Sequence, residues 1–327
     1  MTLSTYEACL KNSAYYLLPL PGFLQVSGQD RLAFLQRQTT NDLHILLPGH
    51  ALSTVLTSPT ARIIDIFSVS EETLSDSSPV LNLISLPGQS EKTEHYLRSR
   101  IFFMDKVGIT NLSSLYDQID LMGPQAFDAL RMLGVKAAPE LNQVLSIDEA
   151  GLHFSLFAQK GVLGTGYRLW VESSAVGNLT QALEASGIPA LPPDIYRILC
   201  VEAGIPQPSA ELTDAFTPLE IGLTDSISMN KGCYTGQEII ARQVNYDKVT
   251  RHLVGLSLDA QVIAGDSVFA DDKPVGQITS CALSPHFGPI ALAVLRRPYN
   301  EPGTPVVVGQ SASSVHATVT LLPFLSS

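Results

Sequence analysis

The sequence has few cysteines, and no two of them lie close together. The four cysteines stand at positions 9, 200, 233 and 281 and form no Cys-x-x-Cys pair. Small disulfide-bonded domains and structural zinc sites need closely spaced or numerous cysteines. We therefore expect a protein of a reducing compartment, with no disulfide framework and no metal or cluster held by its own cysteines.

Positive charge is also scarce, and long apolar runs are missing. The formal net charge is -11 over 327 residues, whereas a nucleic-acid partner would need a basic face. A spanning helix needs about 20 mostly apolar residues, and prolines, glycines and polar residues interrupt the uncharged runs 12–29 and 43–61. The N-terminus shows no basic start leading into an apolar stretch, as a signal peptide would. We expect a cytoplasmic monomer that binds neither nucleic acid nor membranes.

Nucleotide-binding motifs are absent as well, and the pattern of elements favours a layered fold. No Gly-x-Gly-x-x-Gly or phosphate-loop motif occurs. Strand-like and helix-like segments, among them a helix expected over 91–102, alternate without long crossovers, which favours α+β layers over a doubly wound parallel sheet. After residue 249, short strands are expected at 253–258, 267–270, 275–280, 290–295 and 306–308. This spacing predicts a small barrel or sandwich.

The stretch 230–242 carries the clearest chemical signal. Thr235 followed by Glu238 forms a capping-box pattern, which predicts that a short helix starts there. Cys233 would then lie just before the helix, where unpaired amides, the helix dipole and the nearby Lys231 favour an anion. Because the thiolate is the reactive form of cysteine, the pattern indicates an exposed, activated thiol. The alternative is an ordinary buried cysteine.

Two further features accompany the thiol. Gly232 and Gly236 bracket Cys233 and permit a tight or left-handed backbone. Asp65 interrupts the apolar strand 63–69, and a buried acid is costly unless it is paired. Asp65 therefore either faces solvent, which is the commoner outcome, or has a function.

The octapeptide Lys-Gly-Cys-Tyr-Thr-Gly-Gln-Glu at 231–238 resembles the signature of the YgfZ family. Members of this family are folate-binding relatives of the glycine-cleavage T-protein that support the maturation or upkeep of iron–sulfur enzymes. The segment 39–42 is similar to the family's Thr-Asn-Asp element. The segment 195–206 is similar to its Arg-x-Glu-x-Gly-x-Pro element, with Cys200 where an arginine is usual. The likeness covers roughly residues 20–320.

The resemblance implies an α+β fold of two interleaved ferredoxin-like lobes that form a folate cleft. These lobes would occupy residues 1–247, approximately 1–47 with 116–200 and 48–115 with 201–247. A small antiparallel β-barrel would follow at 248–327, in agreement with the strand pattern after residue 249.

The resemblance also implies tetrahydrofolate as the cofactor and Cys233 as the catalytic residue. Asp65, by its match in the T-protein relatives, would contact folate near its reactive nitrogens. The other residues expected to contact the cofactor are Glu202, Lys231, Tyr234, Gln237 and Arg242. One position departs from the transferases, because Arg168 replaces a glutamate that can pair with the pterin ring, and a guanidinium cannot accept hydrogen bonds.

Three functions follow from these features. The leading interpretation is a tetrahydrofolate-binding accessory factor for the assembly, maintenance or repair of iron–sulfur proteins, whose partners would be folate and client proteins. The alternative is a folate-dependent aminomethyltransferase or demethylase of the T-protein type. A third is a folate-binding scaffold in which Cys233 is structural.

Overall fold

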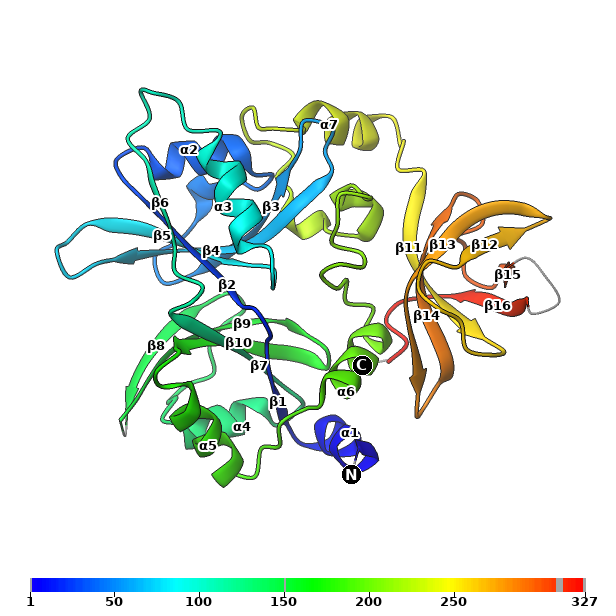
Figure 1. Ribbon diagram of the computed structural model, residues 1–327, viewed down its shortest axis with the longest axis horizontal. Coiled ribbons are helices and arrows are strands. Elements are labelled where there is room, and N and C mark those ends of the chain that lie inside the picture. Colours follow the sequence, from blue (N-terminus) through cyan, green and yellow to red (C-terminus); the bar gives the residue numbers. More distant parts are fainter. Residues whose placement is uncertain (1, 150, 310–313, 326–327) are drawn as a thin grey trace. The chain divides into compact units, whose positions relative to one another are not determined.

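The computed structural model describes residues 2–149, 151–309 and 314–325, and the chain forms two compact units (Figure 1). The first unit comprises residues 1–192 and 225–237, and the second comprises residues 193–224 and 238–327. The chain therefore leaves the first unit, returns to it for the segment that contains Cys233, and leaves it again.

The first unit contains two five-stranded antiparallel sheets. One sheet, sheet A, has the order β1 (Ala14–Leu17), β7 (Tyr116–Met122), β10 (Gly164–Glu172), β9 (Leu152–Gly161) and β8 (Val144–Glu149). The other, sheet B, has the order β3 (Ala51–Thr57), β4 (Ile63–Thr73), β5 (Pro79–Ser85), β2 (Gly22–Ser27) and β6 (Gly108–Asn111). The helices of this unit are α1 (Thr2–Lys11), α2 (Arg31–Gln38), α3 (Ser90–Arg98), α4 (Ala126–Met132) and α5 (Val176–Ala185), with 3-10 turns η1 (Leu43–Ile45) and η3 (Thr224–Ser226).

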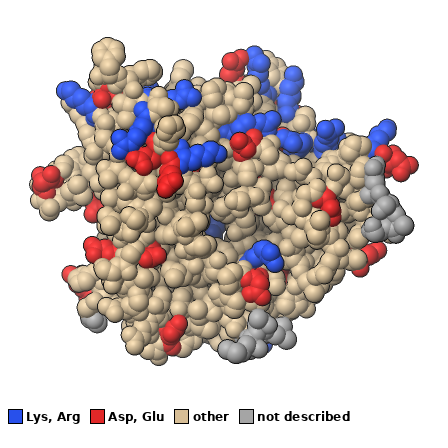
Figure 2. Space-filling model, viewed as in Figure 1, with Lys and Arg blue, Asp and Glu red and all other residues tan. Residues whose placement is uncertain are grey.

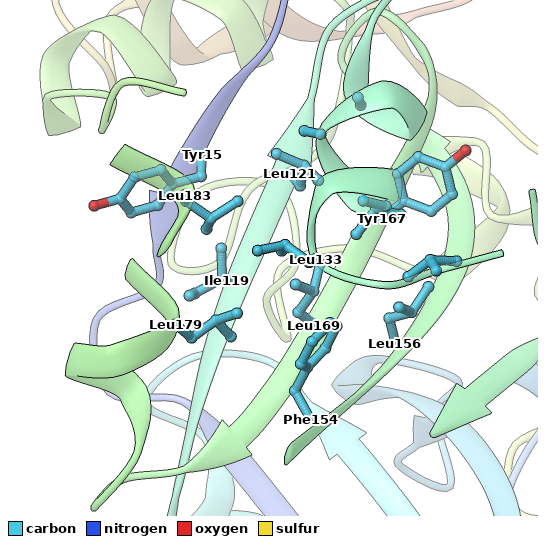
Figure 3. Packing of buried hydrophobic residues seen from close by; sticks show 14 of the residues in the cluster. Tyr15, Ile119, Leu121, Leu133, Phe154, Leu156, Tyr167, Leu169, Leu179 and Leu183 are labelled. Carbon is cyan, nitrogen blue, oxygen red and sulfur yellow. The ribbon is translucent and has the colours of Figure 1, made fainter. Parts of the chain in front are cut away.

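Helices cover one face of each sheet. Successive strand residues point to opposite faces, so Tyr167, Leu169 and Val171 of β10 lie on one face of sheet A. There they pack with α4 and with Leu179 and Leu183 of α5 (Figure 3). In the same way, α2 and α3 pack on one face of sheet B. Each sheet thus has a buried helical side and a second face that is left for other contacts.

The second faces of the two sheets meet each other. Phe23 and Ile84 of sheet B pack with Phe157 and Trp170 of sheet A, and Phe23 stacks on the ring of Tyr116 at a centroid distance of 4.6 Å. The first unit is therefore built in four layers, helices, sheet, sheet and helices. Polar side chains that share these inner faces are held between the sheets.

The second unit contains a closed antiparallel barrel in the order β11-β14-β13-β12-β15-β16. Its strands are β11 (Arg251–Leu258), β12 (Ser267–Ala270), β13 (Lys273–Ser284), β14 (Gly288–Arg296), β15 (Pro305–Val308) and β16 (Val315–Thr320). Its other elements are α6 (Pro193–Glu202), η2 (Pro218–Ile221) and α7 (Gln237–Asn245), of which α7 starts at the boundary between the units.

The predicted fold class is confirmed: the chain is α+β, with two sheets interleaved along the sequence and a C-terminal antiparallel barrel. Some details differ from the expectation. The strand β16 was not expected, because its alternation buries only Ala317 and Val319 and gives a weak apolar signal. The helix expected over 91–102 ends at Arg98, and residues 102–105 form a turn instead. None of the described helices has the length and apolar character that a membrane crossing requires.

Candidate functional site

The loop that carries Cys233 caps the C-terminal end of α2. The last carbonyls of a helix have no partners within the helix, and they carry the negative end of its dipole. The ammonium of Lys231 donates hydrogen bonds to the carbonyl oxygens of Gln36 at 2.8 Å, Thr39 at 2.7 Å and Asn41 at 2.6 Å. One side of the cysteine loop is thus fixed to this helix end.

Lys231 is buried, with 7% of its surface exposed. Burial lowers the pKa of its ammonium to about 8, and the carboxylate of Asp42 opposes this shift. The ammonium also lies 5.1 Å from the centre of the Tyr234 ring, which is a cation–π distance. All three N–H bonds of Lys231 are used by backbone carbonyls, so the structure gives this residue a role in positioning the loop.

The other side of the loop is anchored as well. The backbone N–H of Thr235 donates to the carbonyl of Arg37 at 3.1 Å, and the hydroxyl of Thr57 donates to the carbonyl of Thr235 at 2.6 Å. Gly236 has a φ of +87°, and a Cβ at this position would lie 2.8 Å from the carbonyl oxygen of Ser58. Glycine is therefore required here both by conformation and by space.

The capping box predicted at Thr235 is wrong in position. The helix α7 starts at Gln237, because the left-handed backbone of Gly236 prevents the helix from starting earlier. The carboxylate of Glu238 instead accepts a hydrogen bond from Arg242 at 2.6 Å, an i,i+4 ion pair on the surface of the helix. The long-range contacts of the loop decide where α7 begins.

Cys233 is exposed to solvent. A Cβ built on the neighbouring Gly232 would meet no atom within 4 Å, so the backbone beside the thiol lies in open space. The structure thus places an accessible thiol at the middle of a loop whose two ends are fixed to α2 and to the turn after β3. The alternative of a buried cysteine is wrong for this residue.

Asp65 is fully buried, so the expectation that it faces solvent is wrong. Its carboxylate accepts hydrogen bonds from the hydroxyl of Thr93 at 2.5 Å and from the backbone N–H groups of Leu86 at 3.0 Å and Ile66 at 2.7 Å. Burial raises the pKa of Asp65 to about 7, although these hydrogen bonds favour the charged form. The contact with folate that the resemblance implies for Asp65 stays a prediction.

The remaining predicted site residues fall into both units. Tyr234 and Gln237 belong to the first unit, where Tyr234 is buried and the amide of Gln237 lies 3.5 Å from the carbonyl of Lys231. Glu202 and Arg242 belong to the second unit. Glu202 is buried at the end of α6 and accepts a hydrogen bond from the hydroxyl of Ser284 at 2.6 Å.

A pocket of about 600 Å³, which we call the inter-sheet pocket, lies in the first unit; residues of both sheets line it, including Phe154 and Val171 from the helix-covered side of sheet A. Four aromatic residues line it, namely Phe23, Tyr116, Phe154 and Trp170. Four acidic residues line it, namely Glu71, Glu72, Asp148 and Glu172, and its lining contains no lysine or arginine. In the described residues, no group of three or more His, Cys, Asp or Glu side chains is arranged to hold a metal ion. The inter-sheet pocket is thus aromatic and negative.

The polar groups of the inter-sheet pocket include one hydroxyl that has no hydrogen-bond partner among the described residues. Ser70 is 8% exposed, lines the pocket, and its hydroxyl makes no hydrogen bond to another described residue. The carboxylate of Glu72 accepts a hydrogen bond from Asn82 at 2.5 Å. Burial raises the pKa of Tyr116, and the charges of Glu172 and Glu72 raise it further. These groups offer acceptors and a free hydroxyl to a ligand with ring N–H groups.

Arg168 is already paired within sheet A. It stands opposite Asp120 in the register of β10 and β7, and its guanidinium binds both carboxylate oxygens of Asp120 in a two-pronged arrangement. Gln159 donates to the same carboxylate at 3.1 Å. Arg168 therefore neutralises a carboxylate of this sheet and offers no acceptor of its own.

The sequence did not single out the acceptors of the inter-sheet pocket. In β4, Ser68, Ser70 and Glu72 alternate with the core residues of sheet B, and this period-2 pattern would normally indicate a solvent-facing side. It marks the pocket here because a second sheet covers that face. Trp170, on the same face of sheet A as Arg168, is 7% exposed and also lines the pocket.

Comparisons with known proteins agree in both units. The GCVT N-terminal domain matches residues 21–231, and the glycine cleavage T-protein C-terminal barrel domain matches residues 251–325. A proposed chloroplastic transferase of Arabidopsis thaliana is 31% identical over 313 residues, which cover 93% of this chain and 69% of that protein. An aminomethyltransferase of Listeria welshimeri is 26% identical over 327 residues, which cover 98% of this chain and 88% of that enzyme.

A solved structure has the same fold. The crystal structure of the glycine cleavage system aminomethyltransferase T from Bartonella henselae matches with a TM-score of 0.86 at 20% identity, covering 99% of this chain and 89% of that one. The sequence matches in both parts of the chain carry the assignment beyond the fold. The chain belongs to the glycine cleavage T-protein family, the aminomethyltransferase-like proteins with a GCVT N-terminal domain and a C-terminal barrel.

Proposed function

We propose that this protein is a tetrahydrofolate-dependent one-carbon transferase of the aminomethyltransferase type, and that the pterin ring lies in the inter-sheet pocket. The observation that carries the proposal is the pocket itself, which joins aromatic walls, carboxylates and the unpartnered hydroxyl of Ser70. Family membership supports folate as the ligand class. Of the functions considered from the sequence, the comparisons favour the transferase over the accessory factor.

The pocket residues fit a pterin in size and in chemistry. Ligand pockets commonly measure about 300–1,000 Å³, and this one has about 600 Å³. A pterin presents a flat ring, which suits Tyr116 and Trp170. Its amino and ring N–H groups need acceptors, and Glu72 and Glu172 supply carboxylates where Arg168 cannot.

Each group of pocket residues has a separate role in binding the ring. Glu72 and Glu172 accept the N–H groups of the ring, Ser70 satisfies a ring acceptor with its hydroxyl, and the aromatic walls keep water from the ring faces. Tetrahydrofolate, when bound, supplies the nitrogens that accept a one-carbon unit. Since the pocket lining carries four acidic residues and no lysine or arginine, and its one histidine, His153, contacts Asp148 at 3.0 Å, a cationic amine donor would also be favoured near it.

The accessory role in iron–sulfur protein assembly, maintenance or repair is the second candidate, and one specific observation favours it. A transferase that uses only folate and an amine needs no thiol, yet Cys233 is exposed on a loop anchored at both ends. An accessible thiol can form a mixed disulfide or pass sulfur or iron to client proteins. The resemblance of residues 231–238 to the YgfZ signature supports the same role.

One experiment separates the two candidates. The purified protein is incubated with tetrahydrofolate and amine or methylated donors, and methylenetetrahydrofolate is measured. Sustained turnover that survives the substitution Cys233→Ala is the result expected for the transferase. Absence of turnover with every donor, together with loss of iron–sulfur enzyme activity in cells carrying Cys233→Ala, would favour the accessory factor.

A further inference from the structure

The loop between α3 and β6 displays three consecutive large apolar side chains, which we call the apolar tip. Phe102 is 65% exposed, Phe103 96% and Met104 72%. Figure 1 shows this loop projecting at the upper left, beyond α2 and α3. Exposed large apolar side chains are common singly, whereas a contiguous group indicates an interaction surface.

The apolar tip is held in one shape by its neighbours. The backbone N–H of Asp105 donates to the carbonyl of Phe102 at 2.9 Å, and the carboxylate of Asp105 accepts the backbone N–H of Phe102 at 2.9 Å. Arg37 binds both oxygens of that carboxylate at 2.9 and 3.0 Å, and its guanidinium lies 6.0 Å from the Phe102 ring centre. Because the turn is already ordered, little backbone conformational entropy is lost when its apolar side chains bind.

Basic residues surround the apolar tip, and we call Arg98, Arg100 and Lys106 the basic collar. Arg100 stacks on the ring of Tyr96 at 4.8 Å, and Lys106 donates to the amide oxygen of Gln29 at 3.2 Å. Neither of these two cations has an acidic side-chain partner among the described residues. On the face drawn in Figure 2, lysine and arginine side chains, with acidic side chains among them, lie around an uncharged projection at the upper left, where the loop is found in Figure 1.

The acidic residues near the apolar tip form ion pairs or accept a backbone hydrogen bond. Asp105 is bound by Arg37, and Glu94 pairs with Arg98 at 2.8 Å. Asp30 accepts the backbone N–H of Lys106 at 2.9 Å. Four cations (Arg37, Arg98, Arg100 and Lys106) thus stand against three carboxylates (Asp30, Glu94 and Asp105), so in a chain with a net charge of -11 this loop carries a small positive excess beside exposed apolar surface.

The overall composition predicts no membrane partner, but the local surface favours one: we propose that the apolar tip and the basic collar dock this protein on an anionic phospholipid surface. A convex tip inserts its side chains among the acyl chains near the headgroups, while the cations remain with anionic headgroups. A protein partner would need a flatter apolar area, since stable interfaces bury about 800 Å² on each side, and charged side chains surround this tip. The charge and the shape of the loop therefore favour a membrane surface.

The test is sedimentation of the purified full chain with vesicles. Vesicles of equal parts phosphatidylcholine and phosphatidylglycerol are compared with vesicles of phosphatidylcholine alone. We expect binding to the anionic vesicles that weakens as salt is added. The double variant Phe103→Ser/Met104→Ser should lose about tenfold or more of this binding, and Lys106→Glu should lose about fivefold.

The matched control is Met132→Ser, which removes an exposed methionine, 64% exposed, at the end of α4. It should bind vesicles as the unsubstituted protein does. Because Phe103 and Met104 are exposed, their replacement should leave the melting temperature unchanged, which is measured in parallel. Absence of binding to anionic vesicles, or equal binding by the double variant, would overturn the proposal and leave a protein partner as the occupant of the tip.

Discussion

Replacing Lys231 with methionine removes the ammonium that caps α2 and keeps most of the apolar side-chain length. Three carbonyls lose their donor, and two of them, on Thr39 and Asn41, belong to buried residues. A buried acceptor left without a partner costs about 1–3 kcal/mol. The gain from no longer burying a charge offsets part of this cost, so we expect a loss of about 3 kcal/mol in the free energy of unfolding.

The assay is urea denaturation followed by the fluorescence of Trp170, the only tryptophan, which reports on the first unit. Lys160→Met is the matched control, because Lys160 belongs to the same unit and forms a surface ion pair with Asp225, which is worth about 0–1 kcal/mol. Lys231→Met should also accelerate proteolysis within residues 228–237. Equal stability of the two variants would refute the capping role of Lys231.

Three further predictions follow from the structure. Burial raises the pKa of Asp65 from its usual 3.8 to about 7, so the folded protein binds this proton more tightly than the unfolded chain does. The unfolding free energy should therefore fall as pH rises through that range, because the buried carboxylate becomes charged. In denaturation series at several pH values, Asp65→Asn should reduce this fall by up to about 4 kcal/mol. Gly236→Ala should lower the unfolding free energy by about 2 kcal/mol, while Gly232→Ala, which has open space around it, should change it little. Glu172→Gln should weaken tetrahydrofolate binding about tenfold by calorimetry, and unchanged affinity would remove this carboxylate from the site.

The layered fold could be predicted because the signals that determine it are local. The strand at 63–69 and the turn residues between short C-terminal strands are visible in any window of ten residues or so, whereas the interleaving of the two sheets was expected only from the family resemblance. The end of α3 was predicted less well, because the residues after Arg98 still look helical. After Arg98 the backbone makes i to i−3 bonds from Arg100 to Leu97 and from Ile101 to Arg98, and the carboxylate of Asp105, held by Arg37 from a different element, accepts the N–H of Phe102.

The site was predicted only in part, because several of its contacts join residues that are distant in the sequence. The exposure of the loop around Cys233 was expected, but the role of Lys231 depends on carbonyls that lie 190 to 195 positions earlier in the chain. The inter-sheet pocket depends on pairing between strands that are distant in sequence, so no local pattern marks Ser70 or Glu172 as neighbours. Local rules also misplaced Asp65, whose partner Thr93 lies on α3.

Fluorescence of Trp170 during titration with tetrahydrofolate tests the central claim most directly, because this tryptophan lines the inter-sheet pocket. The account predicts a saturable change in emission, after correction for absorption by the ligand, with the same affinity that calorimetry gives. Glu172→Gln should shift both curves together to weaker binding. Calorimetric binding of tetrahydrofolate without any change in Trp170 emission would contradict the account, because the ligand would then lie outside the inter-sheet pocket.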